Sequence, residues 1–361
     1  MLTEKVDSGD WLLGFAHGWI GALAHHPRIE RVEVVCLELG PHDLPPNVRI
    51  HSMGKERGYG RVRRLLEAQR AIRSAICEVD VALAHMVPRY ALVAAPWAKL
   101  RGVPLVLWYT HRAVSLELRL AHALVSRVVT ASPDSFTLSS RKLTVLGHGI
   151  DLARFRPADS LSGSQEGRLV LAVGRLSPIK NYEALIEAAA RLTARPGFED
   201  VRFAIAGGET EQHPGYAERL RALARQHGIA DRLDLLGPVP PGDMPARYRS
   251  AAVTANLCPT GGLDKAVVES LASGVPAIVH NRTFLPLLGE DASALWVEDL
   301  DPEGVAGRLA ALLTLSPQER AALGLRLAAR ARTGYGLEGF IDRLVAALGE
   351  VAAWQGQKWD M

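Results

Sequence analysis

The stretch Leu169–Asn181, LVLAVGRLSPIKN, predicts a buried strand that ends in a glycine and two cations. Ligands of parallel α/β sheets bind at the carboxyl ends of the strands, and Gly174 lets the backbone come close to one there. Arg175 offers a forked donor and Lys180 a point charge, the two usual ways of holding a diphosphate. Both could equally be solvated loop cations. Few of the 42 basic residues of the chain are lysines, so a lysine at position 180 is less easily explained as an ordinary surface cation.

Short apolar runs alternate with helical patterns on both sides of this stretch, which is typical of parallel-sheet α/β domains. The first half has five such runs: Val32–Leu37, Val79–Ala84, Leu105–Tyr109, Arg127–Ala131 and Lys142–Leu146. The second half has six: Arg168–Val173, Val201–Ala206, Leu233–Leu236, Val253–Leu257, Pro276–Val279 and Ala294–Val297. Met1–Val6 would make a poor first strand, either short or lacking its start.

The chain divides at Arg156–Gly167, RPADSLSGSQEG, a segment rich in Pro, Ser and Gly without apolar periodicity. We therefore expect two domains, at residues 1–157 and 168–336. A final helix, Leu337–Trp354, follows the completed sheet pattern and must pack on a domain already formed.

Composition favours an ordinary globular protein, since 48% of the 361 residues are apolar and 22% are charged. Cys36, Cys77 and Cys258 match no zinc-ligand spacing, and their odd number argues for a reducing compartment. The longest apolar run, residues 91–107, is broken by charges and prolines, and the first ten residues lack the apolar region of a signal peptide. We expect a soluble, cytoplasmic protein.

A basic segment, Lys55–Arg73, carries seven cations against two glutamates, whereas the whole chain has a net charge of only +3. The total is too small to indicate a nucleic-acid partner. The segment could meet an anionic surface, such as a membrane carrying a lipid-linked acceptor. It could also be the solvated face of a half-buried helix, because the apolar residues within it have helical spacing: Val62, Leu65, Leu66 and Ile72.

A second anion site is predicted in Asn256–His280, NLCPTGGLDKAVVESLASGVPAIVH. The segment begins with a strand, which is followed by a loop containing Gly261 and Gly262 and then by a helix that begins at about Asp264. Backbone N–H groups at a helix N-terminus attract anions. Glu269, on the same mostly apolar helix, could accept hydrogen bonds from a sugar diol or lie at the helix surface.

Other catalytic motifs are weak or missing. The triplet Asp299–Asp301 could suggest a metal-dependent transferase, but Asp301 before Pro302 is better explained as a helix N-cap. No GxGxxG follows a first strand, and no GxxxxGK[ST] is present, which argues against a nicotinamide dehydrogenase and a P-loop kinase.

With HGIDLARFRP upstream, GRLSPIKN and VVESLASGVPAIV resemble the retaining glycosyltransferases of family 4. The resemblance is strong over residues 147–281. It implies a GT-B fold: two Rossmann-like, doubly wound parallel-sheet domains facing a cleft, with the C-terminal helix 337–354 returning to the N-terminal domain. Residues 1–157 would then form the acceptor domain and residues 168–336 the nucleotide-sugar donor domain.

The same resemblance implies roles for individual residues. Arg175 and Lys180 would bind the donor diphosphate, Glu269 the ribose hydroxyls, and His111 would lie near the reacting centre unless it is only a strand-end histidine. Gly14 takes the place of the loop that approaches the donor phosphates, although the usual double glycine is absent. The loop GPVPPGDM, residues 237–244, resembles the segment that contacts the nucleobase.

One departure from the family pattern concerns the carboxylate expected eight residues before Glu269, where this chain has Gly261. The sequence TGGLDK resembles a sub-branch with TGSxDK there, which makes Asp264 and Lys265 candidates for sugar or phosphate contact, unless Asp264 only caps the helix.

The resemblance implies sugar transfer with retention, without metal or cofactor, from a nucleoside diphosphate sugar to a glycan or lipid-linked glycan. Two alternatives stay open: an epimerase or phosphorylase on the same fold, and a non-catalytic module inactivated at Gly261.

Overall fold

The computed structural model describes residues 1–158, 168–259 and 262–354 and divides the chain into two compact units. Unit 1 comprises Met1–Gly149 with Leu337–Met361, and unit 2 comprises Ile150–Gly336. The sequence predicts the end of the first domain at residue 157, eight residues later. The difference arises because Ile150 pairs with Gly336 in a β-bridge and Phe155 packs edge-on against Tyr248, both within unit 2.

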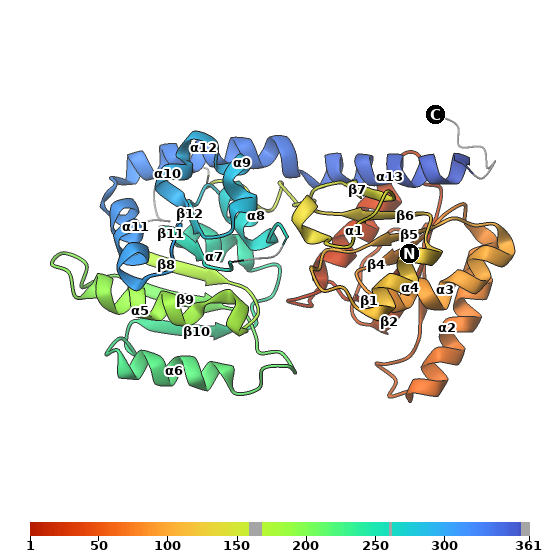
Figure 1. Ribbon diagram of the computed structural model, residues 1–361, viewed down its shortest axis with the longest axis horizontal. Helices are drawn as coiled ribbons and strands as arrows, with labels where there is room; N and C mark the ends of the chain where they lie inside the picture. Colours follow the sequence, from red (N-terminus) through yellow and green to blue (C-terminus); the bar gives the residue numbers. More distant parts are fainter. Residues whose placement is uncertain (159–167, 260–261, 355–361) are drawn as a thin grey trace. The chain divides into compact units, whose positions relative to one another are not determined.

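Unit 1 is built on a seven-stranded parallel sheet with the order β3-β2-β1-β4-β5-β6-β7 (Figure 1). Its strands are β1 (Leu2–Val6), β2 (Val32–Leu39), β3 (Val48–Ser52), β4 (Ala82–His85), β5 (Leu105–Trp108), β6 (Arg127–Thr130) and β7 (Leu143–Val145). The order reverses between β1 and β4, so the connections after these two strands lead to opposite sides of the sheet.

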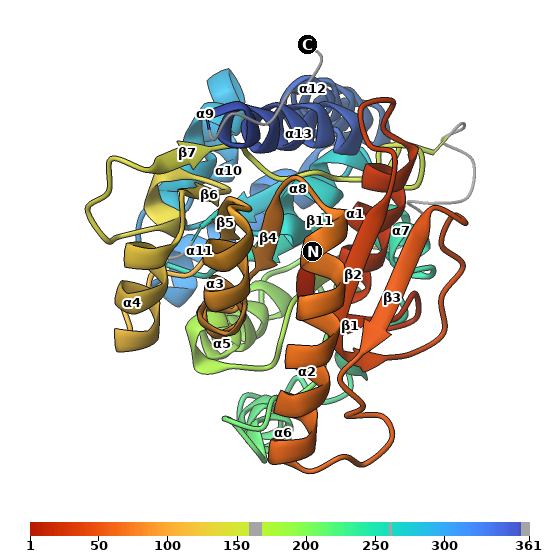
Figure 2. The ribbon, with the colours of Figure 1, turned by 90° about the vertical axis from the view of Figure 1, so that its right-hand side faces the viewer.

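Both faces of this sheet are covered, as the alternation of side chains along its strands requires. On β5, Leu105 and Leu107 enter one buried cluster, whereas Val106 and Trp108 enter the other. The first cluster is completed by α2 (Arg61–Ala75), α3 (Pro88–Arg101) and α4 (Leu116–Leu124), and the second by α1 (Gly14–His25) and α13 (Leu337–Trp354). Figure 2 shows α2, α3 and α4 in front of the sheet.

The predicted last helix is confirmed as α13, and its place in unit 1 is confirmed as well. Phe340 anchors it, being fully buried with its ring 4.3 Å from Trp19 of α1 and 5.4 Å from Trp108 of β5. Helix α13 thereby completes a core whose other residues lie between Met1 and Leu146.

Unit 2 contains a five-stranded parallel sheet with the order β10-β9-β8-β11-β12. Its strands are β8 (Leu169–Val173), β9 (Arg202–Ala206), β10 (Leu233–Gly237), β11 (Val253–Asn256) and β12 (Ala277–Val279). The main helices around it are α5 (Tyr182–Thr193), α6 (Tyr216–Gln226), α7 (Met244–Ser250), α8 (Lys265–Ala272), α11 (Pro302–Thr314) and α12 (Pro317–Tyr335). Two single-turn helices, α9 (Leu285–Leu288) and α10 (Ala292–Leu295), follow β12.

Ten of the eleven predicted strands are confirmed, and three details are corrected. Ala294–Val297 was expected to be a strand, but its first two residues end α10 and only Trp296 forms a bridge, with Val279. Val48–Ser52 is a strand that the sequence reading missed. Met1–Val6 contains a full central strand, β1, despite its polar residues.

The basic helix α2 is less buried than its apolar spacing suggests. Ile72 is buried as expected, but Val62, Leu65 and Leu66 are 75%, 51% and 52% exposed, so they do not form the inner face. Among the described residues, no helix is both long and apolar enough to cross a membrane.

Replacing Phe340 with alanine should destabilise the protein by about 3–5 kcal/mol, because a fully buried aromatic ring leaves a cavity between three elements. Urea unfolding monitored by tryptophan fluorescence would report the loss, since Trp19 and Trp108 line that cavity. The control is Glu338→Ala on the same helix. A change of less than about 1 kcal/mol for Phe340→Ala would contradict the anchoring role of α13.

Candidate functional site

The strand order of unit 2 reverses between β8 and β11, the place where ligands of open parallel sheets bind. Two small adjoining pockets open at the carboxyl ends of these strands. Their walls come from β8, β11, α5, α7 and α8, and include Val173, Lys180, Tyr182, Tyr248 and Asn256.

Two glycines allow the strand ends to approach closely. Gly174 has φ +149° and Gly207, which follows β9, has φ +151°, values that residues with side chains rarely adopt. A Cβ on Gly207 would lie 1.9 Å from the carbonyl oxygen of Gly174, and one on Gly174 would lie 2.9 Å from Cε of Lys180. Gly174 is therefore required both by its own backbone and by the lysine that crosses over it.

Lys180 and Asp264 form the central ion pair of the site, joining the loop after β8 to the loop after β11. The Nδ2 of Asn256 donates to the same carboxylate at 2.8 Å. Through its other oxygen Asp264 accepts a 3.3 Å hydrogen bond from the backbone N–H of Ala266, so it is also the N-cap of α8. Asp264 is therefore both the N-cap of α8, as one reading of the sequence suggests, and the charge partner of Lys180, which the sequence does not indicate.

The acidity of Asp264 reflects these contacts. Burial by itself would raise its pKa. The charge and hydrogen bond of Lys180, together with the hydrogen bonds from Asn256 and Ala266, outweigh burial and lower the pKa to about 2. Asp264 is therefore an anion at any physiological pH. It serves as a fixed negative charge and not as a general acid.

Glu269 has the opposite character, although it lies on the same helix. Burial raises its pKa, against the opposing effects of the Lys265 charge and of a 3.0 Å hydrogen bond from Tyr248. Burial also holds the pKa of Tyr248 well above its usual value, so that hydroxyl remains a donor. A second carboxylate oxygen of Glu269 is left to accept hydrogen bonds from a ligand.

The remaining predicted residues of unit 2 lie around this core. Arg175 is exposed immediately beyond Gly174, and Lys265, partly buried, opens α8. Gly262 is partly buried ahead of α8, while Thr260 and Gly261 lie outside the described residues. The structure thus brings Gly174, Lys180 and Asp264 into direct contact, with the other predicted residues on the adjoining loop and helix.

Three polar residues of the site were not singled out from the sequence. Asn256 holds Asp264, Tyr182 donates to the carbonyl of Gly174 at 2.9 Å, and Tyr248 donates to Glu269. The position of Asn256 at the end of a strand could have indicated it. Tyr182 and Tyr248 carry no such signal, because they are buried helix residues whose hydroxyls alone reach the site.

The aspartate triplet is not part of this site. Asp301 accepts a 2.8 Å hydrogen bond from the backbone N–H of Gly304, which confirms it as the N-cap of α11. Within the described ranges, no three His, Cys, Asp or Glu side chains are grouped as metal ligands would be.

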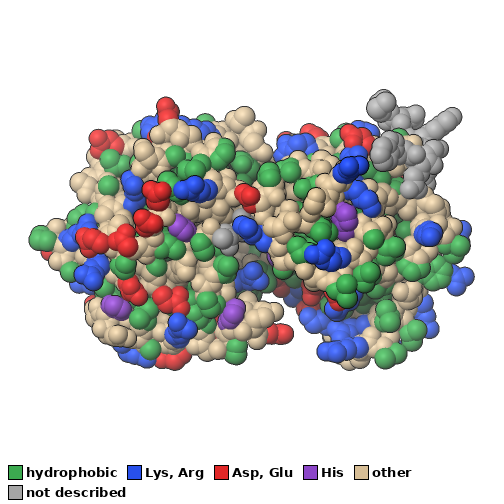
Figure 3. Space-filling model, in the orientation of Figure 1, with side chains coloured by type: hydrophobic (Ala, Val, Ile, Leu, Met, Phe, Trp, Pro, Cys, Tyr) green, Lys and Arg blue, Asp and Glu red, His purple; other side chains and the backbone are tan. Residues whose placement is uncertain are grey.

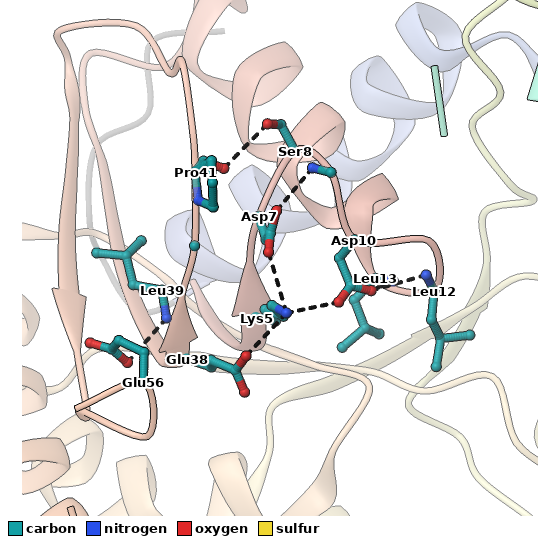
Figure 4. A network of polar contacts seen from close by, with 12 residues as sticks. Lys5, Asp7, Ser8, Asp10, Leu12, Leu13, Glu38, Leu39, Pro41 and Glu56 are labelled. Carbon is teal, nitrogen blue, oxygen red and sulfur yellow. Dashed lines mark hydrogen bonds and ion pairs between the residues drawn. The ribbon is translucent and has the colours of Figure 1, made fainter. Parts of the chain in front are cut away.

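Gly14 and His111 belong to unit 1. Gly14 is the first residue of α1, and the loop before it is fixed by Lys5, which pairs with Asp7, Asp10 and Glu38 at 3.3, 2.9 and 3.0 Å (Figure 4). Asp10 in turn accepts hydrogen bonds from the backbone N–H groups of residues 12 and 13. The β1–α1 loop is thus held by a dense charge network at the point where the strand order of this sheet reverses.

His111 lies three residues beyond the end of β5, further out than the strand-end position that the sequence suggests. Its ring is exposed and meets that of Tyr109 edge-on at 5.4 Å. The Tyr109 hydroxyl donates to the carbonyl of Ala113 at 2.8 Å, which fastens this loop.

Comparison with known proteins finds a family that part of the chain resembles. Residues 159–326 match the family described as "Glycosyl transferases group 1". D-inositol 3-phosphate glycosyltransferase of Acidothermus cellulolyticus is 33% identical over 189 residues, which are 50% of this chain and 42% of that protein. The protein of the same name from Nocardia farcinica is 31% identical over 219 residues, 58% of this chain and 48% of the relative. The chain thus matches less than half the length of these curated relatives.

Solved structures resemble nearly the whole chain. Anabaena Alr3699/HepE in complex with UDP and glucose has a TM-score of 0.76 at 18% identity, covering 96% of this chain and 99% of that one. Sucrose-phosphate synthase from Thermosynechococcus elongatus has a TM-score of 0.75 at 18% identity, covering 98% and 99%. The expected GT-B fold of two doubly wound α/β domains is confirmed, and the segment similar to the glycosyl transferases group 1 family falls within the bounds of unit 2.

Substituting methionine for Lys180 should lower the stability of unit 2 by about 2 kcal/mol, because the half-buried carboxylate of Asp264 loses its cation. Differential scanning calorimetry would detect this as a drop of about 4–8 °C in the melting temperature. Arg175→Met is the matched control, since Arg175 is exposed. Equal melting temperatures for the two variants would contradict the structural weight given to the ion pair.

The two carboxylates of the site should have opposite effects on the pH dependence of stability. With a folded pKa of about 2 against an ordinary 3.8, Asp264 contributes about 2 kcal/mol that is present above pH 4 and lost as the pH falls toward 2. The pKa of Glu269 is raised, so its ionisation opposes folding as the pH rises through that pKa.

Urea unfolding between pH 3 and pH 7 would check this. Asp264→Asn should weaken the acid-range dependence, whereas Glu269→Gln should leave stability at pH 7 unchanged or higher. A loss of stability at pH 7 in Glu269→Gln as large as that in Asp264→Asn would show that both carboxylates are held as stabilising anions.

Proposed function

We propose that this protein is a retaining, metal-independent glycosyltransferase that moves a sugar from a nucleoside diphosphate sugar to an acceptor. The observation that carries the proposal is the Lys180–Asp264 pair at the reversal of strand order in unit 2. The pair lies within the segment that matches the glycosyl transferases group 1 family. UDP and glucose in the similar HepE structure support a nucleotide-sugar donor.

In this proposal Lys180 and Arg175 bind the donor diphosphate. An ammonium group has three donors, and Asp264 engages one of them, so Lys180 can hold a phosphate oxygen while it stays paired. Arg175 is exposed next to Gly174 and supplies the second cation. The backbone N–H groups at the start of α8, near Gly262 and Lys265, add a partial positive charge.

The chemical step needs this charge because negative charge accumulates on the leaving diphosphate as the glycosidic bond breaks. Two cations and a helix terminus can stabilise it without a metal. Retention follows if the acceptor attacks the face that the diphosphate leaves, with a phosphate oxygen taking the acceptor proton. That route requires no enzyme nucleophile, which agrees with Asp264 being locked in an ion pair and Glu269 in a hydrogen bond.

The other predicted residues take supporting roles. The free oxygen of Glu269 accepts from the ribose hydroxyls, the loop 237–244 contacts the nucleobase, and Asp264 and Lys265 orient the transferred sugar. In unit 1, we assign Gly14 to donor binding and His111 to the catalytic residues, and the N-terminal domain as a whole to acceptor binding.

The acceptor in this proposal is a glycan or lipid-linked glycan. A lipid-linked acceptor would place this protein, which we take to be cytoplasmic, at the inner face of a membrane. Contact would be made through the basic segment 55–73. The D-inositol 3-phosphate glycosyltransferases to which about half of the chain is similar support a sugar transferase but leave this acceptor open.

The test is thermal stabilisation by a panel of nucleoside diphosphates and their sugars. A ligand at about 100 times its dissociation constant adds about 2.7 kcal/mol, a shift of about 5–10 °C. We expect one base to stabilise the wild type and Arg175→Ala to weaken that effect. This variant is more informative than Lys180→Ala, which also loses a structural ion pair. Arg191→Ala, an exposed arginine on α5, is the control.

The outcomes separate the proposal from its alternatives. Free nucleotide and an altered sugar formed without acceptor would indicate an epimerase or phosphorylase. Nucleotide binding without turnover in any acceptor panel would indicate a non-catalytic module. If no nucleotide stabilises the protein, the donor site is not where we place it.

A further inference from the structure

Helices α2, α3 and α4 form a continuous layer over one face of the unit 1 sheet. Trp97 of α3 donates to Gln69 of α2 at 2.5 Å, and Arg89 of α3 pairs with Glu117 of α4 at 2.6 Å. The inner side of the layer is closed by small and apolar residues, among them Ala68, Ala94 and Ala121, which enter the buried cluster beneath it. The inner side of the layer thus covers this face of the sheet, and the side chains on its outer side are not part of that core.

The outer side of this layer is unusually apolar. The described part of the chain has eleven exposed large hydrophobic residues, and seven of them lie on these three helices. They are between 50% and 75% exposed: Val62, Leu65 and Leu66 on α2, Leu100 on α3, and Leu116, Leu120 and Leu124 on α4. Those on α4 follow one another at intervals of four residues, so they form a stripe along the helix.

The same layer is strongly basic. Its nine cations are Arg61, Arg63, Arg64, Arg70, Arg73, Arg89, Lys99, Arg101 and Arg119, against Glu67 and Glu117. The resulting charge of +7 exceeds the +3 of the whole chain, so the rest of the protein is net acidic. Both glutamates pair with arginines of the layer, at 3.0 and 2.6 Å. Figure 3 shows basic and hydrophobic side chains intermingled over α2 and α3.

We infer that the outer side of the α2–α3–α4 layer docks onto an anionic lipid bilayer. The leucines would insert at the boundary between the lipid headgroups and the acyl chains, while the longer arginine side chains stay among the headgroup phosphates. The surface would therefore make apolar and ionic contacts with the same bilayer. A second copy of the chain does not fit through the same surface, because a symmetric dimer would bring +7 against +7. A nucleic acid would use the arginines but leave the exposed leucines uncovered.

This inference deepens the membrane contact proposed above for residues 55–73. It does not depend on sugar transfer, since docking needs neither donor nor acceptor. It also extends the surface well past residues 55–73. Four of the seven exposed apolar residues and four of the nine cations belong to α3 and α4.

Co-sedimentation of the full chain with lipid vesicles tests the inference. We expect binding to vesicles of phosphatidylglycerol and phosphatidylcholine, little binding to phosphatidylcholine alone, and release at about 1 M NaCl, where charges are screened beyond about 3 Å. Each basic residue near an anionic surface is worth about fivefold in affinity, equivalent to about 1 kcal/mol. Reversing Arg61 and Arg64 should thus weaken binding at least about 25-fold.

The variants are chosen so that folding is not at risk. Arg61→Glu with Arg64→Glu puts acidic residues in the first turn of α2, where they suit the helix dipole. Arg191→Glu with Arg332→Glu, exposed on helices of unit 2, is the matched charge control. For the apolar part, Leu65→Gln with Leu66→Gln is compared with Leu325→Gln, an exposed leucine of α12.

Loss of binding in both test variants, with both controls unchanged, would support the inference. Equal binding by test and control variants would overturn it, as would failure of the wild type to bind anionic vesicles. A wild-type dimer in sedimentation velocity that Leu65→Gln with Leu66→Gln dissociates would overturn it too, by assigning the surface to a second copy.

Discussion

The ion pair between Lys180 and Asp264 is the contact on which the candidate site depends. It joins two loops whose paired residues are 84 positions apart in the chain. The two loops follow the neighbouring strands β8 and β11, where the strand order of the sheet reverses. Gly174 has a φ of +149° that residues with side chains rarely adopt, and a Cβ there would also push the Lys180 side chain from its place. Helix α8 begins where it does because Asp264 caps it. The phosphate-binding geometry proposed for unit 2 is therefore set before any ligand arrives, which is what electrostatic preorganisation requires.

Much of this could be predicted from the sequence because it is local. A buried strand, a glycine and a following helix specify their own geometry, and the apolar runs identified ten strands. The errors occur where local pattern is a poor guide to tertiary environment. The run Ala294–Val297 is apolar enough for a strand, but it is short and its first two residues finish a helical turn. Met1–Val6 was expected to be a poor strand, short or lacking its start, yet Lys5 belongs to the carboxyl end of a central strand, where three carboxylates surround it.

The pairings themselves could not be predicted. Sequence singled out Lys180 and Asp264 separately, one as a phosphate ligand and the other as a cap or sugar contact, but nothing in either motif says that they touch. That contact follows from the order β8-β11 in the sheet, a long-range property. The buried tyrosines Tyr182 and Tyr248 were missed for the same reason. Each is a core residue by pattern and has a polar role only because its hydroxyl reaches a hydrogen-bond acceptor near the carboxyl ends of β8 and β11.

The two units use charge in opposite ways. In unit 2 the site cation and anion neutralise each other, so a ligand meets a fixed dipolar arrangement with donors left over. On the α2–α3–α4 layer of unit 1 the cations greatly outnumber the anions. Their mutual repulsion destabilises the folded state, and contacts within the layer do not offset it. Exposed leucines beside them add a second cost. A surface that is unfavourable in water on both counts is stabilised by a partner that is both anionic and apolar, and a lipid bilayer has these two properties within one interface.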